Sequence, residues 1–195
     1  LTKSSVNRAD IHSMHSSGRV LVVDALASNI AYIQRLLGGT GLEVCSTCVP
    51  HHAIEAVRRE QPDVVLMDVR MPGASGFEVC QVLKRDAATR LIPVVLMTAA
   101  SDTNDRLMAI EAGADDFVAK PLNVTELKAR LRSLVRLKRF TDDLESAEHV
   151  ILSLALTIEA RDPSTEGHCQ RLATYCRLLG AHLGLEAEDL QALER

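Results

Sequence analysis

Three polar side chains each stand directly after a short apolar run of the sequence. These residues are Asp24, Asp68 and Thr98, and Lys120 lies at the end of a further, shorter run. A carboxylate can attack a phosphoryl donor and form an aspartyl phosphate. The transferred group is anionic, so a lysine and a hard divalent cation must offset its charge. These residue types therefore suit phosphoryl transfer, provided that the fold brings them together.

The apolar runs are typical of strands that are buried on both faces of a parallel sheet. The five expected strands are Val20–Val23, Leu42–Thr47, Asp63–Met67, Pro93–Met97 and Asp116–Ala119. The segments between them predict helices over Ser28–Leu37, His51–Glu60, Gly76–Arg85 and Thr103–Ala112, and Gly113 should end the last of these. Strands that alternate with helices predict a doubly wound α/β domain over residues 18–137.

Ligands of an open parallel sheet bind outside the carboxyl ends of its strands. Two carboxylates, a hydroxyl and an ammonium would converge there, and Mg²⁺ prefers such oxygen ligands while keeping several waters. No GxxxxGK[ST] loop and no Ser-His-Asp arrangement competes with this hypothesis. Gly38–Gly41 lacks the lysine of a phosphate-binding loop and precedes a strand, so it predicts a turn.

Four motifs in this order resemble the receiver domain of bacterial two-component response regulators. They are Arg19–Asp24, Val64–Gly73, Val94–Ala99 and Gly113–Pro121, and the likeness extends from about Arg19 to Arg139. The resemblance implies a flavodoxin-like, doubly wound, five-stranded parallel sheet with the strand order 2-1-3-4-5. A long C-terminal helix and a short helical extension would follow this sheet.

The resemblance implies that Asp68 accepts a phosphoryl group from a sensor histidine kinase or a phosphotransfer protein. Asp24, Asp68 and the backbone carbonyl of Arg70 would hold Mg²⁺. The sequence departs from the family pattern at Ala25, where receivers usually carry a second acid that binds the metal directly. Loss of this acid should weaken Mg²⁺ binding. The alternative is therefore a pseudo-receiver that acts without phosphorylation, as a dimerisation and interaction module.

The family pattern also assigns roles to residues of the last two strands. Thr98 and Lys120 would contact the phosphoryl group, and Phe117 stands where receivers carry a switch aromatic. The peptide bond between Lys120 and Pro121 is commonly cis in this family, an option that X-Pro bonds make accessible.

A single long helix is expected after the receiver, since Val124–Arg161 contains no Gly and no Pro. Its apolar residues alternate by three and four, as in a coiled coil, at Leu137, Phe140, Leu144, Ala147, Ile151, Leu154 and Ile158. We expect a linker helix over residues 138–162 that pairs two copies of the chain, and the alternative is a stripe that packs on its own domain. The six basic residues of Lys128–Arg139 are more typical of a solvated helix face than of a nucleic-acid patch.

The segment from Ala155 onward resembles the first helices of an HD-GYP domain, a metal-dependent phosphodiesterase of cyclic di-GMP. Asp162-Pro163 predicts the start of a new helix. His168 stands where that family has part of its metal site, although a single histidine cannot hold two metals. We therefore expect residues 163–195 to be the truncated start of such an output domain, with no complete catalytic site in this chain. A phosphodiesterase would then be the activity of a longer parent protein.

The composition excludes several other classes of protein. The chain has 195 residues, a net charge of −4, 47% hydrophobic residues and 25% charged residues, which is typical of a folded soluble protein. Its mild acidity and 3% aromatic residues give no reason to expect direct DNA binding. No apolar stretch approaches the roughly 18 residues of a membrane-spanning helix. The polar N-terminus predicts a disordered tail over residues 1–17 of a cytoplasmic protein, and the first residue, Leu1, predicts a fragment.

The five cysteines are odd in number and scattered, which favours reduced thiols. Cys45 and Cys48, followed by His51 and His52, allow two readings: a Cys2His2 zinc site, or a strand followed by a loop. Zinc sites usually place the histidines much further along the chain, so we favour the strand.

Overall fold

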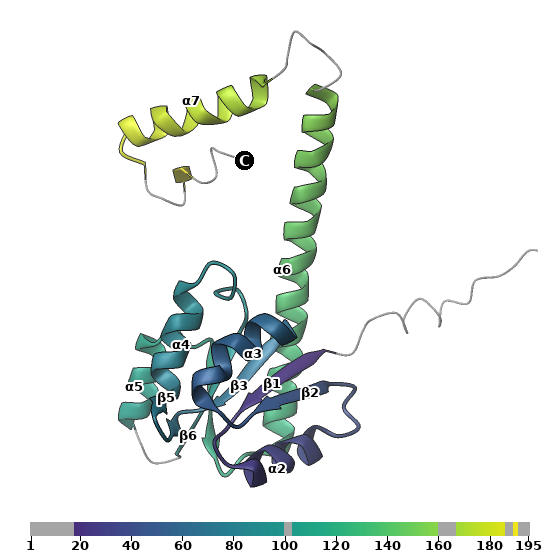
Figure 1. Cartoon of the computed structure of the whole chain (residues 1–195), viewed down its shortest axis with the longest axis vertical. Helices are drawn as coiled ribbons and strands as arrows, with labels where there is room; N and C mark the ends of the chain where they lie inside the picture. Colours follow the sequence, from purple (N-terminus) through teal and green to yellow (C-terminus); the bar gives the residue numbers. More distant parts are fainter. Residues whose placement is uncertain (1–17, 100–102, 160–166, 186–188, 191–195) are drawn as a thin grey trace, which may run out of the picture. The chain divides into compact units, whose positions relative to one another are not determined.

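The computed structural model describes residues 18–99, 103–159, 167–185 and 189–190 (Figure 1). The chain divides into two compact units between Phe140 and Thr141. The predicted tail over residues 1–17 and the predicted helix start at Asp162-Pro163 lie outside the described residues.

The first unit is built on a five-stranded parallel sheet. Its strands are β1 (Arg19–Val23), β2 (Glu43–Thr47), β3 (Val64–Asp68), β6 (Val94–Ala99) and β7 (Asp116–Lys120). They lie in the order β2-β1-β3-β6-β7, which confirms the predicted order. Every residue of β3 is buried, as expected of a central strand covered on both faces.

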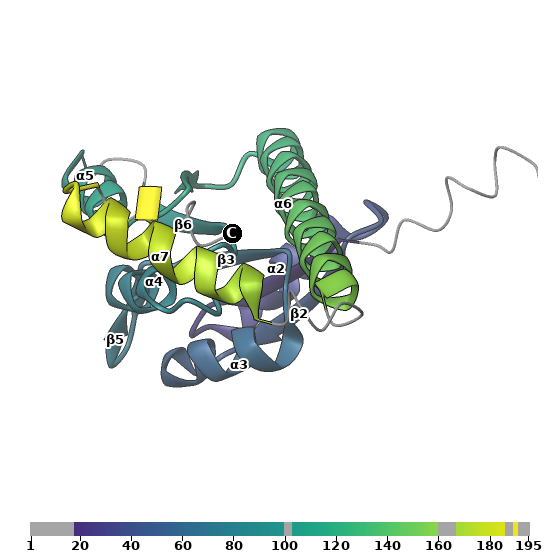
Figure 2. The same cartoon turned by 90° about the horizontal axis from the view of Figure 1, so that it is seen from above.

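Helices cover both faces of this sheet (Figures 1 and 2). One apolar core packs the sheet against α3 (Ala53–Glu60), α4 (Gly76–Arg85) and α5 (Thr103–Glu111). The other packs it against α2 (Ala27–Leu37) and the first part of α6 (Val124–Glu159). This arrangement confirms the doubly wound α/β fold. The observed helices and strands differ from the predicted ones by only a few residues at their ends, and a short 3-10 helix, η1 (Pro50–His52), precedes α3.

The sequence patterns did not reveal a small hairpin after β3. Its strands, β4 (Arg70–Met71) and β5 (Ala74–Ser75), pair antiparallel, and Gly73 turns between them with a φ of 82° that favours glycine. Ser75 then begins α4 with a capping box that includes Glu78. Strands of two residues are too short to show a hydrophobic period, so pattern analysis could not find them.

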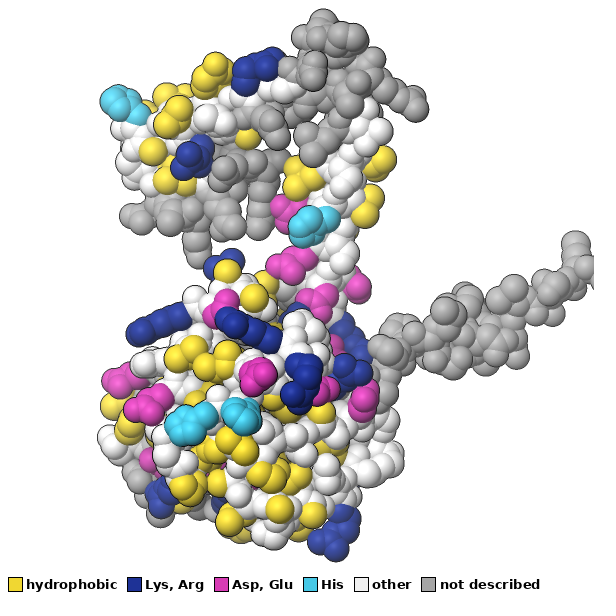
Figure 3. Space-filling model, in the orientation of Figure 1, with side chains coloured by type: hydrophobic (Ala, Val, Ile, Leu, Met, Phe, Trp, Pro, Cys, Tyr) yellow, Lys and Arg dark blue, Asp and Glu magenta, His cyan; other side chains and the backbone are white. Residues whose placement is uncertain are grey.

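Helix α6 changes its surroundings along its length. Leu127, Leu131 and Val135 are buried against the sheet. Beyond them the apolar stripe is exposed, at Leu137, Phe140, Leu144, Ile151 and Leu154. Figure 3 shows apolar side chains standing out along this part of the helix. The predicted seam is therefore not covered by the described residues of the chain.

The last described helix, α7, spans His168–His182. Leu172, Leu179 and Leu183, on the face predicted to be apolar, are exposed. No helix among the described residues is long and apolar enough to cross a membrane.

Cys45 and Cys48, the two cysteines of the possible zinc site, lie in different surroundings. Cys45 lies in β2 and its thiol donates to the carbonyl of Val20 at 3.5 Å, whereas Cys48 lies beyond the strand and is exposed. The described residues contain no group of three His, Cys, Asp or Glu that could hold a metal ion. Burial raises the pKa of Cys45, and it raises that of Cys80 to about 11, so both thiols stay protonated near neutral pH.

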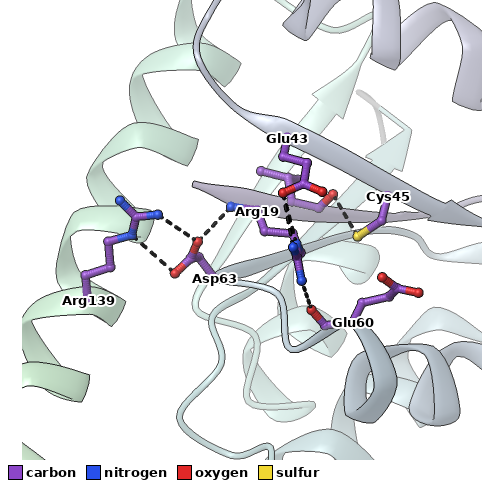
Figure 4. Close-up of polar contacts among 7 residues, drawn as sticks. Arg19, Glu43, Cys45, Glu60, Asp63 and Arg139 are labelled. Carbon is purple, nitrogen blue, oxygen red and sulfur yellow. Dashed lines mark hydrogen bonds and ion pairs between the residues drawn. The ribbon is translucent and has the colours of Figure 1, made fainter. Parts of the chain in front are cut away.

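Asp63 links the amino ends of β1 and β3 to α6 (Figure 4). Its carboxylate accepts the backbone N–H of Arg19 at 2.7 Å, and the guanidinium of Arg139 approaches it at 3.4 Å. The Arg19 side chain donates to the carbonyl of Glu60 and to the exposed carboxylate of Glu43. One carboxylate thus links two strands and α6 at this end of the sheet.

We predict that Asp63→Ala lowers the free energy of unfolding by about 1–3 kcal/mol, because the amide of Arg19 loses its acceptor. Glu43→Ala is the matched control, since it removes the other carboxylate partner of Arg19, and an exposed pair contributes less than about 1 kcal/mol. Urea unfolding of both variants measures the difference. Equal losses would show that Asp63 contributes only a surface ion pair.

Candidate functional site

Two carboxylates and one ammonium meet at the carboxyl ends of the strands. The Nζ atom of Lys120 lies 2.8 Å from Oδ2 of Asp68 and 3.6 Å from Oδ2 of Asp24. Both carboxylates are buried, with Asp24 only 1% exposed. Buried carboxylates repel one another unless a cation lies between them, and Lys120 supplies that cation.

The parallel register explains how residues distant in sequence reach this place. Asp68 pairs in register with Met97, one position before Thr98, and Ala99 pairs with Lys120. The structure therefore brings Asp68, Thr98 and Lys120 to the same edge of the sheet, as predicted. Thr98 is buried, and its role toward a phosphoryl group stays a prediction. The peptide bond between Lys120 and Pro121 is cis, as the family pattern implies.

Asn29, which the sequence analysis did not single out, holds Asp24 in place. Its amide donates to both carboxylate oxygens, at 2.9 and 3.1 Å, and the backbone N–H of Leu26 donates to Oδ1 at 2.8 Å. Two donor groups besides Lys120 therefore make three hydrogen bonds to this one carboxylate. The position of Asn29 in the first turn of a predicted helix, five residues after Asp24, was the available signal.

Gly76 is a second residue that the sequence analysis missed. A Cβ atom there would collide with the backbone carbonyl of Asp68 and lie 2.8 Å from the Cα of Val69. The backbone N–H of Gly76 donates to the carbonyl of Val69 at 3.0 Å. Only a glycine lets α4 start this close to the backbone of Asp68 and Val69.

Mg²⁺ is the cofactor that the family pattern implies for this site. The oxygen donors match a hard cation: the carboxylates of Asp24 and Asp68 and the carbonyl of Arg70. Asp24 is already engaged by Asn29 and Leu26, and the side chain of Ala25 supplies no oxygen. The residues therefore fit Mg²⁺, but with fewer protein ligands than two adjacent acids would provide.

Two arginines connect the site to its surroundings. The guanidinium of Arg106 in α5 lies over the ring of Phe117, 4.7 Å from its centroid, a cation–π arrangement. The guanidinium of Arg70 lies 3.6 Å from the carboxylate of Asp105, also in α5. Phe117 is thus in contact with α5, the helix that follows Thr98.

His168, the predicted metal-site residue of the output domain, lies in α7 of the other unit, and its side chain is outside the described residues.

Two residues of the basic run of α6 make ion pairs within the first unit. Arg130 makes ion pairs with Asp116 and Glu126, each at 2.6 Å, and these hydrogen bonds raise the pKa of Arg130. Arg139 contacts Asp63. These contacts favour a structural role for two of the six basic residues.

A family model, the response regulator receiver domain, matches residues 20–132. The response regulator PleD of Caulobacter vibrioides is 42% identical over 132 residues, which are 68% of this chain and 29% of that protein. The DNA-binding response regulator MtrA of Mycolicibacterium paratuberculosis is 41% identical over 137 residues, 70% of this chain and 57% of that protein. The matched part spans less than two thirds of the length of either relative.

Solved structures share the fold of the first unit. The receiver domain of a signal transduction histidine kinase from Syntrophus aciditrophicus is 30% identical, with a TM-score of 0.57, and the match covers 61% of this chain and 90% of that one. The chemotaxis protein CheY4 of Vibrio cholerae is 24% identical, with a TM-score of 0.56, and the match covers 60% and 98%. The second likeness shows the fold alone.

We predict that Ala25→Asp strengthens Mg²⁺ binding about tenfold or more, because it adds a carboxylate beside Asp24, and even outer partners of a metal site change affinity by about 10–100-fold. Isothermal titration calorimetry measures the affinity. Ser28→Asp is the matched control: it adds the same charge to the exposed side of α2, where salt screens it. Equal effects of the two substitutions, or none from Ala25→Asp, would disprove the importance of Ala25.

Proposed function

The chain belongs to the response regulator receiver family of two-component systems, and we propose that it accepts a phosphoryl group on Asp68. The donor is a sensor histidine kinase or a phosphotransfer protein. The observation that supports this proposal is the ammonium of Lys120, which lies between Asp68 and Asp24 at the carboxyl ends of the strands.

The proposed reaction transfers the phosphoryl group from a histidine nitrogen of the donor to a carboxylate oxygen of Asp68. An oxygen of Asp68 attacks phosphorus, the phosphorus–nitrogen bond of the donor histidine breaks, and the imidazole keeps the electron pair. Lys120 offsets the negative charge that the transfer brings to the site, and Thr98 donates its hydroxyl to the phosphoryl oxygen. Asp24, Asp68 and the carbonyl of Arg70 would hold Mg²⁺, which supplies further positive charge when bound.

The phosphorylated site would act as a switch. Thr98 moves toward the phosphoryl group, and Phe117 repacks in the space beside it, which changes the surface formed by α5, β7 and α6. The contact of Phe117 with Arg106 supports a link between this ring and α5. A local change of charge would thus bias a two-state element.

The long helix would carry this change to the output through a homodimer. The exposed stripe of α6 supports this part of the proposal, because five apolar residues at coiled-coil spacing face solvent. A second copy of the chain offers the same stripe, so the pairing is self-complementary. The stripe begins at Leu137, two residues after Val135, the last residue of α6 described as buried.

The resemblance of Ala155–Arg195 to an HD-GYP domain supports a cyclic-di-GMP phosphodiesterase as the output of a longer parent protein. This sequence contains no His-Asp dyad and no Gly-Tyr-Pro motif, so the activity would need residues beyond it. The relative MtrA is described as DNA-binding, but the mild acidity of this chain gives no support for direct DNA binding. We propose that the protein acts in the cytoplasm.

We predict that acetyl phosphate or beryllofluoride with Mg²⁺ modifies the wild-type chain at Asp68 and does not modify Asp68→Asn, which lacks the nucleophilic oxygen. Mass spectrometry of the intact protein and of its peptides measures and locates the aspartyl phosphate, and native mass spectrometry measures bound beryllofluoride. Asp86→Asn is the matched control, because Asp86 is an aspartate outside the site, and it should be modified like the wild type. An adduct on another residue would refute the assignment, and no adduct at saturating Mg²⁺ would favour the pseudo-receiver.

We predict that Ile151→Asp weakens self-association of the chain at least about a hundredfold, because an unpaired charge in a helix seam costs roughly 3 kcal/mol or more. Analytical ultracentrifugation measures the dimer. Ser153→Asp places the same charge on another face of α6 and should leave the dimer intact. A monomeric wild-type chain, or a dimer that resists Ile151→Asp, would contradict pairing through this stripe.

A further inference from the structure

The side chain of Arg70, two residues after Asp68, connects the segment that follows β3 to helix α5. Its backbone N–H lies 3.5 Å from Oδ1 of Asp68, and its guanidinium lies 3.6 Å from Oδ2 of Asp105. The Arg70 side chain is 65% exposed, whereas that of Asp105 is 12% exposed. One residue therefore touches the proposed phosphoryl acceptor with its backbone and a buried carboxylate of α5 with its side chain.

The contact between Arg70 and Asp105 is one that a stronger anion can break. Ion pairs with an exposed partner are weak, and 3.6 Å is longer than a charge-assisted hydrogen bond of about 2.7–2.9 Å. A phosphoryl group carries roughly −1.5 to −2 charge and three acceptor oxygens, and a guanidinium binds such a group through two parallel hydrogen bonds.

Asp105 can also tolerate the loss of this partner. It lies in the first turn of α5 (Thr103–Glu111), where the partial positive charge of the helix N-terminus stabilises a carboxylate. The cost of separating the pair is therefore smaller than for a carboxylate in the middle of a helix.

The charges of the site give Arg70 a reason to change partner. Asp24 and Asp68 carry two negative charges, and the ammonium of Lys120 offsets one of them. Phosphorylation adds negative charge, while Ala25 leaves the expected metal with one carboxylate fewer than in the family pattern. A second side-chain cation at the edge of the site would make up part of this deficit.

We propose that Arg70 exchanges Asp105 for the phosphoryl group when Asp68 is phosphorylated. The guanidinium becomes a phosphoryl-binding group, and the first turn of α5 loses its contact with Arg70. Phosphorylation would then alter two contacts of α5: the ion pair between Arg70 and Asp105, and the contact between Phe117 and Arg106. This inference rests on the proposed function, because it requires a phosphoryl group on Asp68.

The test is a double-mutant cycle in the full chain with beryllofluoride as the phosphoryl mimic. The variants are Arg70→Met, Asp105→Asn and the pair of substitutions together, each with Mg²⁺ at saturation. Mg²⁺ affinity is measured separately without beryllofluoride, so that a metal effect is recognised. Arg70→Met keeps the backbone carbonyl that the family pattern assigns to the metal, and Asp105→Asn keeps the shape of the buried side chain.

The exchange predicts effects of opposite sign. Arg70→Met should weaken beryllofluoride binding about tenfold, because a charged hydrogen bond is lost. Asp105→Asn should tighten binding about threefold, because it removes the competing anion. In the Arg70→Met background, Asp105→Asn should have no effect, since the competition no longer exists. Arg70→Lys should fall between Arg70→Met and wild type, because it keeps the charge without the paired hydrogen bonds.

Hydrogen exchange gives a second readout that does not depend on affinity. Beryllofluoride should raise the exchange rate of amides in the first turn of α5 in the wild type, and the rise should be smaller in Arg70→Met. Unchanged affinity in Arg70→Met, or the same effect of Asp105→Asn in both backgrounds, would overturn the exchange while leaving phosphorylation of Asp68 intact. Failure of the wild type to bind beryllofluoride would instead overturn the proposed function and the exchange together.

Discussion

The ammonium of Lys120 between two buried carboxylates is the interaction on which this receiver depends. Asp24 and Asp68 stand at the ends of neighbouring strands, and without a cation they would destabilise one another. Lys120 comes from β7, and β6 lies between β7 and β3. Adjacent strands are about 4.8 Å apart, so the lysine must extend past the end of β6.

The same parallel topology shows which parts of the site the sequence could predict. Asp24, Asp68 and Thr98 each end a buried apolar run, and such runs identify their own strands without any knowledge of the neighbours. Asn29 and Gly76 act through contacts with residues of other segments, and no local pattern shows these contacts. The strand order came from the resemblance of four motifs to a family, because hydrophobic periodicity carries no information about which strands are neighbours.

Ala25 gives this receiver an unusual balance of charge. With a second acid, the site would depend on a divalent cation to offset three carboxylates. Here two carboxylates face one ammonium, and Asn29 and Leu26 donate three hydrogen bonds to Asp24. The unphosphorylated site is therefore well compensated by the protein itself. The site would need additional positive charge mainly after the proposed transfer of a phosphoryl group to Asp68.

The rigidity of the central strand, β3, limits how a structural change at Asp68 could be transmitted to the rest of the domain. Asp68 ends β3, and Asp63 immediately precedes that strand, where it fastens Arg19 and Arg139. The two aspartates are five residue steps apart, which corresponds to roughly 17 Å of extended strand, and all of β3 is buried. A close-packed strand cannot bend to relay a small displacement without strain in both cores. We propose that the change instead passes around the edge of the sheet, through exposed Arg70 and partly buried Phe117, to α5 and then to the surface that includes α6.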